Sequence, residues 1–315
     1  MKILELTGEK ALKCEHAQHW NHWLNLNGRS RNRIQEEYLQ AKARSQEIVT
    51  FQLTKENKFQ AGCSLLLRQT ENSGTTKNIF MISRVIVAPE CRNQGMLRRV
   101  FFEVNSFLED ENVTGLIVAR RGVDGMYEKL GFSPFATFTK YDLINKIENT
   151  TKLIEVDRLI PDSLVKISFI KELYNLNFRT FFPSLSRGEI EWRYIIEQNL
   201  KNNISIYMIN YKFDSVGYFI LRDREIIEIA MLSNLDRQFY HEILSRIFIS
   251  FNIDSLRIQR SHPLIEFHLE IWKKVESRQP IQGGHLLRLP KSTSDLMREQ
   301  IRNTSGTFIS VLDEF

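Results

Sequence analysis

The hydrophobic period changes within one short stretch of the sequence, "VIVAPECRNQGMLRRVFFEV", which spans residues 85–104. Before Pro89 the stretch is apolar and rich in β-branched residues, which is typical of a strand. After the turn, apolar residues recur at helical spacing, at Leu97, Val100, Phe101, Val104 and Leu108. This pattern indicates an amphipathic helix packed on a sheet. The stretch therefore predicts a strand, a glycine-containing turn and a helix.

Such a turn has the properties of an anion site. The first amides of a helix lack intrahelical acceptors and carry partial positive charge, so phosphate groups bind there readily. Gly95 removes a β-carbon from the turn, and Arg92, Arg98 and Arg99 add positive charge. The motif is neither a Walker A sequence nor G-x-G-x-x-G, and a strand, turn and helix occur in many α/β proteins. The turn alone therefore fits either a phosphate site or a plain connection.

The segments around this turn predict the rest of a sheet. Three segments of strand-like composition precede the helix and are separated by turn-prone residues, which indicates an antiparallel meander at residues 47–54, 59–68 and 78–88. The segments after the helix predict a buried strand, a short helix closed by Gly131 and a final strand, at residues 113–120, 123–132 and 135–144.

The length of 315 residues favours two domains, because a single core rarely grows that large. Residues 147–157 lose apolar periodicity and predict a linker between domains at 1–146 and 158–315. The second half again predicts two helices, a meander and a helix, and its "VGYFILR" (216–222) echoes "AGCSLLLR" (61–68). It has no counterpart of the glycine turn. The predicted class is α+β, with two copies of one unit.

Two motifs together carry a resemblance to a known family. The pattern V-x-V-x-P-x-x-R-x-x-G at 85–95, followed by "YEKLGF" at 127–132, resembles the GNAT superfamily of acetyl-CoA-dependent N-acetyltransferases. The resemblance covers about residues 48–142 and includes the order of elements. It implies two GNAT-like domains, each a mixed, mostly antiparallel sheet flanked by helices, of which the second is degenerate.

The resemblance also implies roles for particular residues. The backbone of Val85, Ile86 and Val87 would pair with the pantetheine arm of acetyl-CoA, and Tyr127 would protonate the departing thiolate. Alternatively, Tyr127 is a packing residue. The residues expected to hold the pyrophosphate are Arg92, Asn93, Gln94, Gly95, Met96, Leu97 and Arg98.

The sequence departs from the family pattern in three places. Leu97 stands where the family usually has Gly or Ala, and Arg120 where it often has Asn. The third departure is that residues 78–88 contain no carboxylate, although many members place a general base on this strand. The base that deprotonates the amine is therefore unassigned. A water chain past Ser83 is one candidate, and the predicted N-terminal helices, with His16, His19 and His22, are another. These histidines also fit a substrate-facing or core-edge helix without a catalytic role.

The function expected from these features is transfer of an acetyl group from acetyl-CoA to a primary amine by direct attack, with a small-molecule acceptor favoured over a protein. Two alternatives stay open. One is a non-catalytic acyl-CoA-binding or regulatory module, and the other is an aminoacyl-tRNA-dependent ligase built on a doubled GNAT-like fold.

Composition argues against several other classes of protein. Residues 1–150 hold 21 Lys and Arg against 17 Asp and Glu within a net charge of +5, an excess too small to predict nucleic-acid binding. The sequence has no apolar run of membrane-spanning length and no signal-like start, so we expect neither a membrane partner nor export from the cytoplasm. Its three cysteines fit no metal-binding spacing, so no metal is expected. The oligomeric state is left open.

Overall fold

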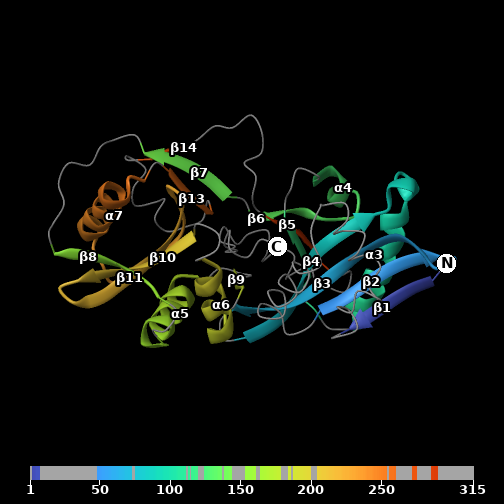
Figure 1. Cartoon of the computed structure of the whole chain (residues 1–315), viewed down its shortest axis with the longest axis horizontal. Helices are drawn as coiled ribbons and strands as arrows, with labels where there is room; N and C mark the ends of the chain where they lie inside the picture. Colours follow the sequence, from blue (N-terminus) through green and yellow to red (C-terminus); the bar gives the residue numbers. More distant parts are fainter. Residues whose placement is uncertain are drawn as a thin grey trace.

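The computed structural model describes residues 2–7, 48–72, 75–110, 113, 115–119, 124–136, 138–143, 153–160, 164–178, 184–185, 187–199, 204–253, 255–259, 272–274 and 285–289. These residues form two lobes that lie side by side, each built on one sheet (Figure 1). The predicted helices with His16, His19 and His22 lie outside the described residues, as do Arg120 and Cys14, one of the three cysteines.

The first sheet has the strand order β1-β2-β3-β4-β5-β15-β6, with β9 paired to β3 off this path. Strands β2, β3 and β4 form the predicted antiparallel meander, and β5 runs parallel to β4. The strands are β1 (Lys2–Thr7), β2 (Ile48–Lys55), β3 (Lys58–Asn72), β4 (Thr75–Val87), β5 (Leu116–Ala119), β6 (Ser133–Ala136), β9 (Ser184–Leu185) and β15 (His285–Arg288).

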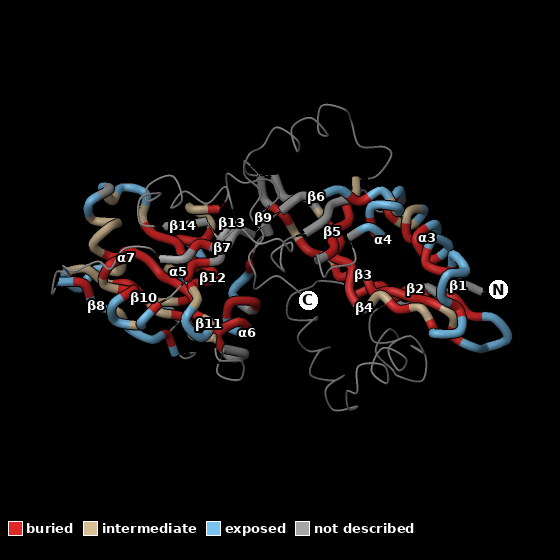
Figure 2. The backbone as a smooth tube through the Cα atoms, turned by 90° about the horizontal axis from the view of Figure 1, so that it is seen from above, coloured by how far each residue is buried: buried red, intermediate tan, exposed pale blue. Residues whose placement is uncertain are grey.

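Helix α3 (Met96–Asp110) covers one face of this sheet. Its predicted apolar stripe is buried against apolar residues of β2, β3 and β4, among them Phe51, Leu65 and Phe80. A short 3₁₀ helix, η2 (Pro89–Cys91), precedes it, and α4 (Asp124–Glu128) follows β5. Figure 2 shows the buried strands enclosed by exposed turns and helix surfaces. The helical period of the sequence therefore located both the helix and its buried face.

The second sheet has the strand order β14-β7-β13-β12-β11-β10-β8. Helices α5 (Leu164–Phe178) and α6 (Glu189–Asn199) pack on one face, and α7 (Arg237–Phe251) packs on the other. The strands are β7 (Phe138–Leu143), β8 (Ile154–Arg158), β10 (Ile204–Tyr211), β11 (Asp214–Arg222), β12 (Glu225–Met231), β13 (Ser255–Gln259) and β14 (Trp272–Lys274). Among the described helices, none is long and apolar enough to cross a membrane.

The two sheets share one order of elements. In each, an antiparallel meander is followed by a helix and then by a strand parallel to the last strand of the meander: β4 with β5, and β12 with β13. The α+β class and the two mixed sheets flanked by helices are as predicted.

The strand pairing crosses the domain boundary predicted from the sequence. Residues 135–144 were expected to form one strand of the first domain, but β6 ends at Ala136 and β7 pairs with β13 and β14 of the second sheet. Conversely, β15, which lies within the second predicted domain, is placed between β5 and β6 of the first sheet. Four of the residues predicted to form a linker, 154–157, belong to β8. A strand-forming run does not encode which sheet it joins, because periodicity reports burial and not the pairing partner.

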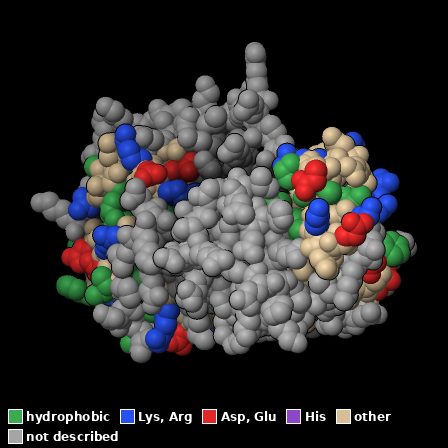
Figure 3. Space-filling model, turned by 45° about the vertical axis from the view of Figure 1, so that its right-hand side comes forward, with side chains coloured by type: hydrophobic (Ala, Val, Ile, Leu, Met, Phe, Trp, Pro, Cys, Tyr) green, Lys and Arg blue, Asp and Glu red, His purple; other side chains and the backbone are tan. Residues whose placement is uncertain are grey.

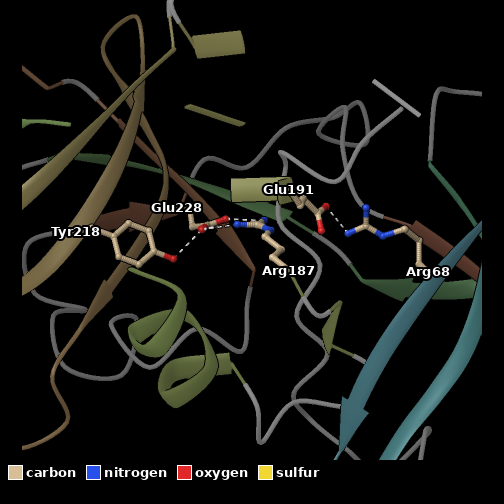
Figure 4. A network of polar contacts seen from close by, with 5 residues as sticks. All are labelled: Arg68, Arg187, Glu191, Tyr218 and Glu228. Atoms are coloured by element: carbon tan, nitrogen blue, oxygen red, sulfur yellow. Dashed lines mark hydrogen bonds and ion pairs between the residues drawn. The ribbon is translucent and has the colours of Figure 1, made fainter. Parts of the chain in front are cut away.

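A buried polar network also joins the lobes (Figure 4). Arg68 on β3 forms an ion pair with Glu191 on α6, with side-chain exposures of 1% and 7%. A few residues away, Arg187 donates to both carboxylate oxygens of Glu228 at 2.8 and 3.0 Å. Since β9 pairs with the end of β3, the segment from β9 to α6 is held by both sheets.

The buried charge of Glu228 is compensated by its neighbours in the core of the second lobe. Tyr218 donates to Oε1 of Glu228 at 2.8 Å, and the Arg187 guanidinium lies 4.4 and 4.9 Å from the ring centres of Tyr174 and Trp192. Burial is the main cause that raises the pKa of Tyr218 well above its usual value, and the charge of Glu228 is the second. The phenol therefore stays protonated and keeps its hydrogen bond to Glu228.

We expect Arg187→Met to destabilise the protein by about 3–5 kcal/mol, because it leaves the Glu228 carboxylate buried without its cation. The urea midpoint, followed by tryptophan fluorescence, measures this loss. Arg193→Met is the matched control: its ion pair with Glu189 is half exposed, so the expected change is within about 0.5 kcal/mol. The triple variant Arg187→Met/Glu228→Leu/Tyr218→Phe should recover most of the loss, and a failure to recover would contradict the electrostatic explanation.

We also expect that a chain ending at residue 146 does not fold. It lacks β15, so the backbone groups of β5 and β6 that pair with β15 are left exposed. Circular dichroism should show no cooperative thermal transition for this fragment, and co-expression with residues 147–315 should restore one. A cooperative transition in the isolated fragment would refute the reciprocal dependence of the two sheets.

Candidate functional site

The pairing between β4 and β5 stops before β4 ends. The last paired residues are Ile82 and Val118, whereas β4 continues to Val87. On its other side β4 stays paired with β3, at Ile86 with Gly62 and at Val87 with Ala61. In the described part of the chain, the β5-facing edge at Val85–Val87 therefore has no partner strand and can accept an extended ligand.

A β-bulge lies at the start of this open edge. Ser83 pairs with Ser64 and Ile86 pairs with Gly62, so Arg84 and Val85 together oppose Cys63. Arg84 has a φ of 52°, in the left-handed region that arginine seldom adopts. Bulges of this kind re-aim the strand beside functional sites. The bulge could not be predicted from the sequence, because Ser83, Arg84 and Val85 are not residue types that signal a left-handed backbone.

The turn after β4 leads directly into α3, and its residues from Arg92 to Gly95 are exposed. The N–H of Ala88 donates to the Gln60 carbonyl at 2.8 Å, which fixes the start of the turn. Asn93 and Gly95 have φ values of 60° and 72°, in the left-handed region. A backbone in which right-handed and left-handed residues alternate forms a concave nest of N–H groups that binds anions. The first bond of α3 runs from the Arg99 N–H to the Gly95 carbonyl, so the three preceding amides lack intrahelical acceptors.

Space is open above this turn. Among the described residues, a β-carbon added to Gly95 would meet no atom within 4 Å, so they leave the backbone there accessible to a ligand. The side chains of Arg92, Asn93, Gln94 and Arg98 are exposed; Gln94 Nε2 donates to the Glu90 carbonyl at 2.7 Å, which secures the turn. These residues fit a pyrophosphate, with amides from the helix start and charge from arginines.

Two residues predicted to bind the cofactor, Met96 and Leu97, have only their backbone available for it. The Met96 and Leu97 side chains are buried in the core with α3 and the sheet. Leu97 therefore points away from the turn, as its place in the helical stripe indicates. The core accommodates the Leu97 side chain, which leaves the turn open.

Tyr127 lies on α4 and belongs to the same buried cluster as α3. Its ring is 5.5 Å from that of Phe132 and 6.4 Å from that of Phe101, both edge-on. Its carbonyl accepts from the N–H groups of Leu130 and Phe132, and Gly131, at a φ of 87°, closes the helix. The ring is thus fixed by packing, which suits a positioned proton donor and also suits the packing role considered for it.

The face of the first sheet opposite α3 carries buried polar residues beside apolar ones such as Leu66 and Met81. Thr50, Ser64 and Ser83 lie in one cross-strand row on β2, β3 and β4. The hydroxyls of Thr50 and Ser64 are 3.1 Å apart. Hydroxyl-bearing residues on a buried face are typical of a surface that meets polar groups. On the face in Figure 3, the described Lys and Arg side chains lie among acidic ones.

No protein-family model and no curated protein matches the sequence. Solved structures do resemble the chain. A conserved protein from Enterococcus faecalis V583, a probable N-acyltransferase, has a TM-score of 0.70 at 14% identity, covering 92% of this chain and 72% of that one. A GCN5-related N-acetyltransferase from Anabaena variabilis ATCC 29413 has a TM-score of 0.68 at 16% identity, covering 92% and 73%.

Eis1 from Mycobacterium abscessus is similar over less of the chain, with a TM-score of 0.55 at 12% identity and coverage of 76% and 64%. At such identities the likeness concerns the fold. The motifs at 85–95 and 127–132 had predicted the same fold from the sequence. The chain therefore has the fold of the GCN5-related N-acetyltransferases.

Proposed function

We propose that the protein is an N-acetyltransferase that moves an acetyl group from acetyl-CoA to a primary amine by direct attack. The observation that carries the proposal is the coincidence of two features at the end of β4. The strand loses its β5 partner after Ile82, and the amides of an open glycine turn lie directly beyond Val87. An extended arm that ends in a pyrophosphate requires these two features in this order.

Each part of the chain has a distinct task in this proposal. The edge of β4 at Val85–Val87 binds the amide groups of the pantetheine arm, as a neighbouring strand would. The turn at Arg92–Arg98 binds the pyrophosphate through backbone amides and two arginines. Acetyl-CoA supplies the acetyl group as a thioester. Binding far from the reacting carbon holds that carbon in place for attack and so lowers the entropic barrier.

Tyr127 is the proton donor in the proposal. A phenol has an ordinary pKa of about 10 and a thiol one of about 8.5, so proton transfer to a thiolate depends on a fixed, close hydroxyl. The packing of Tyr127 against Phe101 and Phe132 supports this role, because it limits the ring to one position. The acceptor is proposed to be a small amine, and no metal is part of the proposal.

The two alternatives differ from the proposal in what they require. An acyl-CoA-binding module needs the turn but no proton donor, so Tyr127→Phe would leave it unaffected. A ligase that uses aminoacyl-tRNA has no need of a pyrophosphate site. The open turn at Gly95 favours a ligand that carries a pyrophosphate, which argues against the ligase. The transferase is preferred to the binding module because Tyr127 is held in a fixed position beside α3.

We expect Gly95→Trp to weaken acetyl-CoA binding at least tenfold, a loss of about 1.4 kcal/mol. The indole would occupy the space above the turn. Thermal shift and calorimetry with acetyl-CoA measure the effect. Gly95→Ala is the control for backbone strain, since both variants place a β-carbon at positive φ, at a cost of about 1–2 kcal/mol. Equal affinities of the two variants for acetyl-CoA would contradict the proposed pyrophosphate site.

We expect Tyr127→Phe to lower kcat by about 100-fold or more while the KM for acetyl-CoA stays within a few-fold, because only the proton donor is removed. Thiol release in the presence of a panel of primary amines measures both constants. Tyr240→Phe is the matched control, since that hydroxyl donates to the Leu232 carbonyl in the second lobe. Unchanged turnover in Tyr127→Phe, with lowered thermal stability, would support the packing role instead.

A further inference from the structure

The bulge on β4 contains an arginine in a strained backbone conformation. Arg84 has a φ of 52°, which brings its β-carbon close to a backbone carbonyl oxygen. Among the described residues, every other non-glycine residue with a positive φ lies in a turn or at a helix end, whereas Arg84 lies within a strand. Strain of this kind persists only where the surroundings hold it, and it is common at ligand sites. The conformation of Arg84 therefore needs a cause.

A bulge at this place in the fold does not by itself require a left-handed residue. The second lobe has a bulge on β12, where the pairing with β11 skips Ile227. The parallel pairing of β12 with β13 ends at Ile226, directly before this bulge. Ile227 is not among the residues with a positive φ. The strain at Arg84 is therefore not imposed by strand pairing, and its effect is to set the course of the arginine side chain.

The guanidinium of Arg84 lies on the face of the sheet away from α3. Its Nη1 donates to Oγ of Ser83 at 3.1 Å, and its Nε is buried. Ser83 pairs with Ser64 and belongs to the buried row of hydroxyls on that face. Ile82 and Ile86, on either side of the bulge, belong instead to the core with α3. Arg84 is nevertheless partly exposed, so its guanidinium is anchored at Ser83 and still reaches solvent.

This position coincides with the end of the proposed acetyl-CoA site. With the pyrophosphate at the turn after β4, the pantetheine arm runs back along the open edge at Val85–Val87, and its thioester end reaches the bulge. The pairing of β5 with β4 ends at Ile82, two residues before Arg84. An acceptor that approaches the thioester between the separating strands therefore passes Arg84.

We propose that Arg84 binds a carboxylate of the acceptor, so that the substrates are small amino acids and not simple alkylamines. This inference rests on the proposed function and names the class of its acceptor. A guanidinium presents a planar fork of N–H donors that matches the two oxygens of a carboxylate. The single charge of a carboxylate is also balanced by one guanidinium, whereas a phosphate group carries about two charges near neutral pH.

The charge of Arg84 separates the two classes of amine. An alkylamine has a pKa near that of lysine, about 10.4, so it approaches as a cation and is repelled by the guanidinium. The carboxylate of an amino acid offsets this repulsion and adds charge-assisted hydrogen bonds. Binding of the carboxylate at Arg84 also holds the amino group of the same molecule near the thioester, which favours attack.

The test compares acceptors in which a methyl group replaces the carboxylate: glycine with ethylamine, β-alanine with n-propylamine, and 4-aminobutyrate with n-butylamine. We expect the unaltered protein to favour the amino acid in at least one pair by about tenfold or more in kcat/KM, measured by thiol release. Arg84→Asn should lower kcat/KM for that amino acid by about tenfold or more, mainly through KM. It should change kcat/KM for the matching alkylamine by less than about threefold, because that amine makes no bond to Arg84.

The backbone conformation supplies the control for folding. Asparagine adopts a positive φ more easily than arginine does, so Arg84→Asn should keep or raise the melting temperature. Arg84→Gly relieves the strain fully and should show the same loss of activity. Arg84→Lys should fall between the two, since it keeps the charge but not the fork. Arg193→Gln, half exposed on α6 of the second lobe, should leave both activities unchanged.

The outcomes separate this inference from the proposed function. An equal loss of kcat/KM for both members of a pair in Arg84→Asn would mean that Arg84 acts on the thioester or on the fold, and would refute carboxylate binding. Alkylamines that are turned over as well as the amino acids would refute it too, while the transferase itself would stand. If no primary amine of either kind supports thiol release from acetyl-CoA, the proposed function fails, and the role of Arg84 fails with it.

Discussion

The end of pairing between β4 and β5, at Ile82 and Val118, is the constraint on which the candidate site depends. Parallel strands that stay paired would leave no edge for a ligand. On one face of the sheet, α3 and α4 pack where β4 and β5 separate, and their residues Phe101 and Tyr127 lie in the same core. It is accompanied by the bulge at Arg84 and Val85, which changes the course of β4. The opening is thus built into packing and backbone geometry.

Much of the first lobe could be predicted from the sequence because its signals are local. The helical spacing from Leu97 to Leu108 located α3 and its buried face, and Gly95 and Gly131 have the positive φ values that only glycine adopts easily. The motif at 85–95 indicated the turn, and Leu97 was correctly assigned to the core. These features depend on residues that are neighbours in the sequence.

The remainder could not be predicted because it depends on partners distant in the sequence. Residues 135–144 read as one strand, yet β6 (Ser133–Ala136) and β7 (Phe138–Leu143) join different sheets. Nothing in "HLLR" at 285–288 indicates pairing with residues some 170 positions earlier. The bulge at Arg84 had no sequence signal, since arginine does not favour that backbone conformation.

The reciprocal exchange of β7 and β15 has a consequence for how the protein is made. Domains usually fold as units in the order of their synthesis. Here β5 and β6 leave the ribosome well before residues 285–288 do, so the first sheet waits for its missing strand until most of the second lobe has been translated. During this interval its unpaired edges are sites for pairing with other chains. Assembly of the candidate site is therefore a late event, set by the timing of translation as well as by the stability of either core.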